Sequence, residues 1–325
     1  MLPSFEYTQP RSLSQALTQL ATPGAHAHAG GTDLIGCLRD NVFAAKRVVS
    51  LGHIDELRGI RPSSDGGLRI GALTTIADIA IHAVVKERYS ALALAAALVA
   101  SPQLRNQGTL GGNLCQRPRC WYFRGDYHCS RKGGDTCYAI AGDSRYHAIF
   151  GGAGCFVVHP SDTAPALMAL GASIRVQGAR GNRVVPVDQF FVGPDRDITR
   201  ETVVTAGEIV TEVLLPAPRA GLRSTYRKVR ARAAWDFALA GAAVALTTKD
   251  GRIDTARIVL SGVAPIPWRV PAAEQALIGH AADASAIAAA ADAAVLRADP
   301  MTDNAYKVAM ARGVVLEAIE ACVRS

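Results

Sequence analysis

Five of the chain's seven cysteines lie within 41 consecutive positions, from Cys115 to Cys155. Directly before them comes a glycine-rich stretch, residues 108–113, in which Gly111 and Gly112 are adjacent. Glycines have no Cβ atom, so backbone N–H groups can come close to a bound group and turn towards it. Packing alone does not require so many thiols in one place. The stretch therefore predicts a phosphate-binding loop joined to a metal-binding insertion.

A second pair of adjacent glycines, Gly30 and Gly31, follows an extended segment and precedes a predicted helix that ends near Leu38. Thr32 or Asp33 can cap that helix. Free backbone N–H groups and the helix dipole both favour an anion at such a turn. One double glycine before a helix is more often a simple turn. Two such loops, each able to hold part of a dinucleotide, favour a dinucleotide site much more strongly.

Length and composition indicate a folded protein of two domains, since 49% of the 325 residues are apolar. The net charge of +7 suits an anionic cofactor, an acidic partner protein or nucleic acid. The basic residues are scattered and follow no nucleic-acid-binding pattern, so we predict no nucleic-acid partner. The longest apolar run, residues 91–100, is half of what a bilayer crossing needs, and we predict no membrane insertion. No signal-peptide pattern is found, which favours a cytoplasmic protein with reduced thiols.

Hydrophobic periodicity and turn residues predict an α+β fold in two domains. The N-terminal domain covers residues 1–219, with subdomains at about 1–54 and 55–219. Prolines at 216 and 218 mark its end, and the C-terminal domain covers residues 220–325. There, three extended segments followed by alanine-rich helices predict a three-stranded antiparallel sheet covered by helices. Other predicted elements include a single helix at about 75–85, a strand at 155–160 and a helix from 161 or 162 to near 170.

Four motifs, in this order, resemble the FAD-binding medium subunits of the molybdenum hydroxylases. This is the family of xanthine dehydrogenase, carbon monoxide dehydrogenase and aldehyde oxidoreductase. The motifs are Ala29-Gly30-Gly31-Thr32-Asp33-Leu34, Thr109-Leu110-Gly111-Gly112-Asn113, His159-Pro160-Ser161-Asp162 and Tyr226-Arg227-Lys228-Val229-Arg230. The resemblance covers nearly the whole chain. It implies a two-subdomain FAD-binding module of the PCMH type and a C-terminal domain of the CO dehydrogenase flavoprotein type.

The resemblance also implies which residues hold FAD. The pyrophosphate would lie on the first glycine loop, and the rest of the cofactor along the second. Asp162 would accept hydrogen bonds from FAD, Ile209 would pack against the isoalloxazine ring, and Lys228 would lie near the flavin. The residues alone favour a helix cap for Asp162 and a solvated cation for Lys228. The implied set is Ala27, His28, Ala29, Gly30, Gly31, Thr32, Asp33, Leu34, Thr109, Gly111, Gly112, Asn113, Asp162, Ile209 and Lys228.

The cysteine insertion, residues 115–155, is similar to one in the FAD subunits of bacterial periplasmic-type aldehyde oxidoreductases and of 4-hydroxybenzoyl-CoA reductase. There it carries a 4Fe–4S cluster. The resemblance implies four ligands, with eight, seven and seventeen residues between successive ones: Cys120, Cys129, Cys137 and Cys155. Four thiolates suit zinc equally well, and spacing alone does not choose four cysteines from five, so Cys115 remains a substitute. Five nearby basic residues would either offset the cluster's charge or form a solvated rim: Arg117, Arg119, Arg124, Arg131 and Lys132.

The implied function is electron transfer within a heterotrimeric molybdenum hydroxylase, or a dimer of such heterotrimers, with an aldehyde oxidoreductase as the first choice. A large molybdenum-cofactor subunit would oxidise the substrate, and a small 2Fe–2S subunit would pass the electrons on. FAD in this chain would deliver them to an external acceptor, and no residue here is predicted to be catalytic. The alternatives are a subunit like that of 4-hydroxybenzoyl-CoA reductase or xanthine dehydrogenase, and a non-enzymatic zinc-stabilised interaction module. The compartment would be periplasmic instead of cytoplasmic if a partner subunit carries the export signal.

Overall fold

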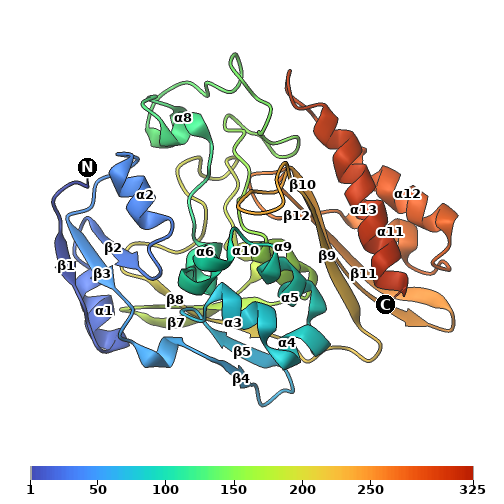
Figure 1. The fold of residues 1–325 in the computed structure, drawn as a ribbon, viewed down its shortest axis with the longest axis horizontal. Helices are drawn as coiled ribbons and strands as arrows, with labels where there is room; N and C mark the ends of the chain where they lie inside the picture. The colour runs from blue at the N-terminus through green and yellow to red at the C-terminus, as the bar shows by residue number, and fades with distance from the viewer. Residues whose placement is uncertain (1, 325) are drawn as a thin grey trace.

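The computed structural model describes residues 2–324, which form two N-terminal subdomains, a loop-rich insertion and a C-terminal domain (Figure 1). The first subdomain, at the left of Figure 1, is a parallel sheet of order β1-β3-β2 with two helices. Its elements are β1 (Glu6–Thr8), α1 (Leu13–Leu20), β2 (Ala25–His28), α2 (Leu34–Arg39) and β3 (Arg47–Ser50). The chain leaves the carboxyl end of β2 through Gly30 and Gly31 into α2, which is the strand–turn–helix geometry that favours anions.

The second subdomain is an antiparallel sheet of order β4-β5-β8-β6-β7, with helices that carry the second glycine loop. Its strands are β4 (Ile60–Pro62), β5 (Leu68–Gly71), β6 (Ser173–Gly178), β7 (Gly181–Pro186) and β8 (Ile209–Leu215). Its helices are α3 (Ile76–Ile81), α4 (Ala83–Arg88), α5 (Ser90–Ala97), α6 (Pro102–Gln107), α7 (Leu110–Leu114), α9 (Thr163–Ala169) and α10 (Val187–Phe190). Residues of this sheet, α5 and α9 together form the largest hydrophobic core of the described chain.

Two predicted elements of the N-terminal domain are wrong. The single helix expected at 75–85 is divided into α3 and α4, because His82 between them is extended, with ψ of 123°. The strand expected at 155–160 is irregular backbone. Its hydrogen bonds go to loops rather than to a sheet: His159 N–H donates to the Ala264 carbonyl at 2.8 Å. An apolar run indicates that a segment is buried, and a loop packed between two domains is buried as well as a strand is.

The C-terminal domain has an antiparallel sheet of order β12-β11-β10-β9. Its elements are β9 (Arg223–Val229), β10 (Ala240–Lys249), β11 (Arg252–Ser261), β12 (Trp268–Arg269), α11 (Pro271–Leu277), α12 (Ala284–Val295) and α13 (Tyr306–Arg324). The expected sheet is therefore present, but it has a fourth strand of two residues, too short to give a periodic signal. The first eight residues of β10 are buried, since helices lie on both faces of this sheet. Small side chains, mainly alanine, allow that close double packing.

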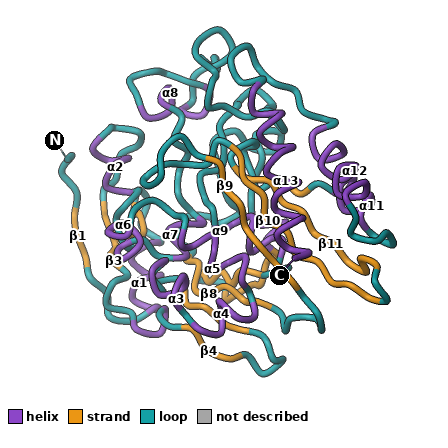
Figure 2. The backbone as a smooth tube through the Cα atoms, turned by 45° about the vertical axis from the view of Figure 1, so that its right-hand side comes forward, coloured by secondary structure: helices purple, strands orange, loops and turns teal. Residues whose placement is uncertain are grey.

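The insertion between α7 and α9 is mostly loop, with one helical turn, α8 (Trp121–Arg124), and a 3₁₀ turn at Ser130–Lys132. Figure 2 shows it as the teal region around and beside α8, between α2 and the C-terminal helices. Because it has so little regular structure, side-chain contacts must fix its position. Among residues 2–324, we find no helix with the length and hydropathy of a membrane span.

Candidate functional site

The two glycine loops, nearly eighty residues apart in sequence, touch each other. A Cβ atom built on Gly30 would lie 1.9 Å from the carbonyl oxygen of Gln107, the last residue of α6. Gly31 has a φ of 73°, in the left-handed region that other residues rarely adopt. Backbone therefore packs on backbone here, and only glycine fits at position 30.

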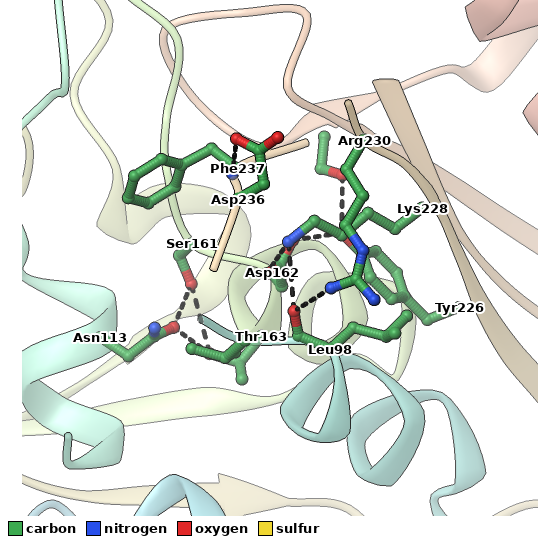
Figure 3. A network of polar contacts seen from close by, with 12 residues as sticks. Leu98, Asn113, Ser161, Asp162, Thr163, Tyr226, Lys228, Arg230, Asp236 and Phe237 are labelled. Carbon is green, nitrogen blue, oxygen red and sulfur yellow. Dashed lines mark hydrogen bonds and ion pairs between the residues drawn. The ribbon is translucent and has the colours of Figure 1, made fainter. Parts of the chain in front are cut away.

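The second loop is fixed at both of its ends. Thr109 caps α7, with its Oγ1 accepting the Gly112 N–H at 3.2 Å. Asn113 Oδ1 accepts hydrogen bonds from the hydroxyls of Ser161 and Thr163 at the start of α9 (Figure 3). These contacts tie the second loop to the segment that carries Asp162.

Three pockets that share lining residues adjoin one another from these loops to the C-terminal domain, and together they are called the cleft and its three sections. The first section, about 410 Å³, is lined by both loops and includes Ile209. The second shares Thr32, Thr109 and Gly112 with it and adds Asn113 and Asp162. The third shares Asp162 with the second and ends at Cys120 and His147. The predicted cofactor residues on the walls are Ala27, Ala29, Gly30, Gly31, Thr32, Asp33, Leu34, Thr109, Gly111, Gly112, Asn113, Asp162 and Ile209.

Of the described residues predicted to hold the cofactor, His28 and Lys228 lie behind these walls. His28 Nε2 lies 2.7 Å from where a Gly31 Cβ would be, so its ring supports the first loop from behind. Lys228 lies behind Asp162 and donates to its Oδ2 at 2.7 Å. The structure therefore gives both residues positions that support the walls.

Asp162 is the centre of a buried polar network (Figure 3). Its Oδ1 accepts from the Tyr226 hydroxyl at 2.7 Å, and Lys228 occupies Oδ2. The helix-cap role favoured by the residues alone is wrong, because the Asp162 side chain makes no cap bond to α9. The solvated role for Lys228 is wrong too, since its side chain is 1% exposed. Burial raises the pKa of Asp162, and the Lys228 ammonium opposes that rise.

Replacing Lys228 with methionine is expected to lower the free energy of unfolding by about 3 kcal/mol, because Asp162 would stay buried without its counter-ion. Guanidinium unfolding followed by circular dichroism measures this. Arg227→Met is the matched control, since the Arg227 side chain is 44% exposed and its ion pair with Glu317 is long, at 3.7 Å. We expect the control to lie within about 0.5 kcal/mol of the wild type. If the guanidinium midpoint of Lys228→Met equals that of the wild type, the buried pair contributes nothing to stability.

The four cysteines predicted as ligands line one small cavity in the insertion: Cys120, Cys129, Cys137 and Cys155. Cys115, the substitute, lines the first section of the cleft instead. Two of the four sulfurs have nitrogen neighbours. Arg131 Nε donates to Cys155 Sγ at 3.4 Å, and His147 Nε2 lies 3.3 Å from Cys120 Sγ. Within residues 2–324, no three His, Cys, Asp or Glu side chains converge closely enough to hold one metal ion.

The five basic residues near the cysteines divide into different roles. Arg131 is 4% exposed and contacts Cys155, so the solvated-rim alternative is wrong for it. Arg119 and Arg124 bind Asp33 of the first glycine loop, at 2.9 and 2.7 Å. Lys132 donates to the Gly125 carbonyl within the insertion at 2.7 Å, and Arg117 Nε lies 3.1 Å from the Glu201 carboxylate.

Three contributors received no role from the sequence: Tyr226, His147 and Glu201. Glu201 binds Arg131 at 2.6 Å from a loop far along the chain, and no local pattern predicts that contact. Tyr226 had a usable signal. It is two residues before Lys228 on β9, so both side chains point to the same face of the strand, towards Asp162.

Comparison with known families identifies both domains. Residues 3–218 match the family of the FAD binding domain in molybdopterin dehydrogenase. Residues 224–322 match the CO dehydrogenase flavoprotein C-terminal domain. The break between the two matches falls in the loop before β9.

Individual relatives agree over nearly the full length. The chain is 36% identical to the aldehyde oxidoreductase FAD-binding subunit PaoB of Escherichia coli, covering 91% of each chain. It is 31% identical to the carbon monoxide dehydrogenase medium chain of Hydrogenophaga pseudoflava, covering 98% of this chain and 97% of the relative. Among solved structures, the reconstituted CO dehydrogenase from Oligotropha carboxidovorans superimposes with a TM-score of 0.80 at 26% identity, with all of both chains covered.

Proposed function

The chain belongs to the FAD-binding medium subunits of the molybdenum hydroxylases, and on that basis we propose that it serves an aldehyde oxidoreductase. In that enzyme it would take electrons that come from a molybdenum subunit through a 2Fe–2S subunit and pass them to an external acceptor. Membership makes the chain a subunit of an FAD-dependent oxidoreductase. The aldehyde substrate is the finer step, supported by the higher identity to the aldehyde oxidoreductase relative than to the carbon monoxide dehydrogenase relative.

The observation that carries the proposal is the series of three adjoining sections from the two glycine loops to Cys120. FAD is a long anionic dinucleotide, and its pyrophosphate suits the Gly30–Gly31 turn at the start of α2. Arg119 Nε, on a side chain that lines the second and third sections, is buried without a hydrogen-bond partner among the described residues. The residues present thus fit FAD. When bound, it would supply the one- and two-electron chemistry.

The chain's own residues bind and shield the cofactor. The first loop would hold the pyrophosphate, and Ile209 in the first section would exclude water from one apolar part of the cofactor. Asp162, held by Lys228 and Tyr226, keeps a fixed acceptor on the wall of the second and third sections. None of these groups is a base for substrate hydroxylation, so the chain alone should leave the substrate unchanged.

A 4Fe–4S cluster in the insertion is the second part of the proposal. In such a cluster each thiolate binds a different iron, so the four sulfurs surround a volume without meeting at one point. A single zinc ion requires four ligands around one centre. The four cysteines line one shared cavity, so the ligand set suits a cluster, and the resemblance of the insertion favours the cluster over zinc. Cys120 and His147 line both this cavity and the end of the cleft, so a cluster there would lie next to the cofactor.

Reconstitution with a molybdenum subunit and a 2Fe–2S subunit tests the proposed function. An aldehyde and a purine are each added without oxygen to the oxidised complex, and an aromatic CoA thioester is added to the chemically reduced complex, while the flavin absorption band is followed. We expect the aldehyde to bleach the band in the complex, and no compound to change the band in the isolated chain. Bleaching by the purine alone, or return of the band on addition of the thioester to the reduced complex, would assign the chain to a different enzyme of the family.

A further inference from the structure

The carboxylate of Asp33, on the first glycine loop, is held entirely by the cysteine insertion. It accepts the backbone N–H of Arg117 at 2.7 Å and the guanidinium groups of Arg119 and Arg124 at 2.9 and 2.7 Å. The expected helix cap is absent, since the Asp33 side chain makes no cap bond to α2. A residue of the predicted pyrophosphate loop therefore depends on the insertion for its position.

The same arginines shape the segment that carries Cys120. Arg124 Nε donates to the Pro118 carbonyl at 2.8 Å, and its Nη2 donates to the Arg117 carbonyl at 3.0 Å as well as to Asp33. The Arg124 N–H also donates to the Cys120 carbonyl at 2.9 Å. Arg124 thus connects Asp33, through its guanidinium group, to the segment just before Cys120, and contacts Cys120 itself through its backbone N–H.

A second branch of the network reaches another cysteine. Arg117 Nε lies 3.1 Å from Glu201, and Arg131 Nη1 lies 2.6 Å from the same carboxylate. Arg131 Nε then donates to Cys155 Sγ at 3.4 Å. The Arg131 and Glu201 side chains are 2% and 9% exposed, so solvent screens this branch poorly.

The insertion that carries these arginines has little regular structure of its own. Between α7 and α9 it contains one helical turn and one 3₁₀ turn, and the four predicted ligands come from four separate points along it. Binding to one cluster would tie these four points together. Loss of metal would therefore leave the segment that carries Arg117, Arg119 and Arg124 less ordered.

We propose that Asp33 couples FAD binding to the metal-loaded state of the cysteine insertion. With metal bound, the arginines neutralise Asp33 and hold the first loop ready for the pyrophosphate. Without metal, the arginines release Asp33. Its carboxylate then repels the phosphates of FAD, and FAD binding must order the first loop again. By thermodynamic linkage, FAD must strengthen metal retention by the same factor. This inference rests on the proposed function, because it requires both cofactors.

The test measures the dissociation constant of FAD by flavin fluorescence, using the full chain in iron-loaded and chelator-treated forms. We expect iron removal to weaken FAD binding by about tenfold, the middle of the usual range for coupled sites. In Asp33→Asn the repelling charge is gone, so the ratio between the two forms should fall towards one. In Arg124→Gln the iron-loaded form should bind FAD about as weakly as the iron-free wild type.

Asp292→Asn is the matched control, because Asp292 makes an exposed ion pair with Arg312 on the C-terminal helices. This variant should keep the tenfold ratio of the wild type. Equal FAD affinity of the two wild-type forms overturns the coupling and leaves the proposed function intact, and that comparison requires no folded variant. If Asp33→Asn keeps the full ratio of FAD dissociation constants between the two forms, the role of Asp33 is overturned. If the wild type binds neither iron nor FAD, the proposed function itself fails.

Discussion

Replacing Cys129 with serine is expected to lower the iron content of the anaerobically purified chain from about four atoms to less than one. Cys129 is 6% exposed and lines the cavity that it shares with the other three predicted ligands. A serine hydroxyl is a hard oxygen ligand that replaces a soft thiolate poorly, and three ligands hold a cluster weakly. Iron analysis per folded chain, with the broad iron–sulfur absorption as a second readout, measures the change.

The matched control is Cys115→Ser, the fifth cysteine of the stretch. Its side chain lines the first section of the cleft and not the cysteine cavity, so the iron content should equal that of the wild type. Unchanged iron in Cys129→Ser would refute the ligand assignment. Loss of iron in Cys115→Ser would place Cys115 among the ligands.

Replacing Gly30 with alanine is expected to abolish FAD retention through gel filtration and to weaken FAD binding by about a hundredfold or more, which is about 3 kcal/mol. The new Cβ would lie 1.9 Å from the Gln107 carbonyl oxygen and 2.7 Å from its carbon. Both atoms belong to backbone, so no side-chain rotation relieves the overlap and the two loops must separate. The protein should also unfold more easily, by about 1–3 kcal/mol, as for other overpacked sites.

Gly36→Ala is the control for this substitution, six residues from Gly30 and inside α2. The nearest atom to its Cβ would be Arg124 Nη1, at 4.0 Å, so the methyl group has room. We expect normal FAD binding and a stability gain of about 0.5–1 kcal/mol from the helix-favouring side chain. FAD binding by Gly30→Ala equal to that of the control would show that the loop contact does not form the cofactor site.

The two glycine loops have local sequence signals. Adjacent glycines indicate a close approach of another segment: Gly30 meets the Gln107 backbone, and Gly111, inside α7, meets Ala72. The four cysteines were chosen by resemblance, since spacing left Cys115 open, and the structure places them around one cavity. The C-terminal sheet was predictable because its main strands are long and buried. Its fourth strand, β12, has two residues and leaves no periodic trace.

The parts that depend on long-range contacts were not predictable from local pattern. Asp33 looks like a helix cap in sequence, yet it binds arginines more than eighty residues away. Asp162 looks like a cap for the same reason and instead pairs with Lys228 from another domain. Caps and buried ion pairs use the same residue types, and only the fold determines which partner is near. The predicted strand at 155–160 failed because burial between domains imitates burial in a sheet.

Cofactor analysis of the anaerobically purified chain determines whether the two glycine loops and the cysteine insertion form adjoining sites for a dinucleotide and a cluster. Flavin released by denaturation is identified by chromatography, and iron, sulfide and zinc are measured on the same sample. We predict one FAD and about four iron atoms with matching sulfide for each chain. A colourless protein that contains one zinc ion and no flavin would contradict the account.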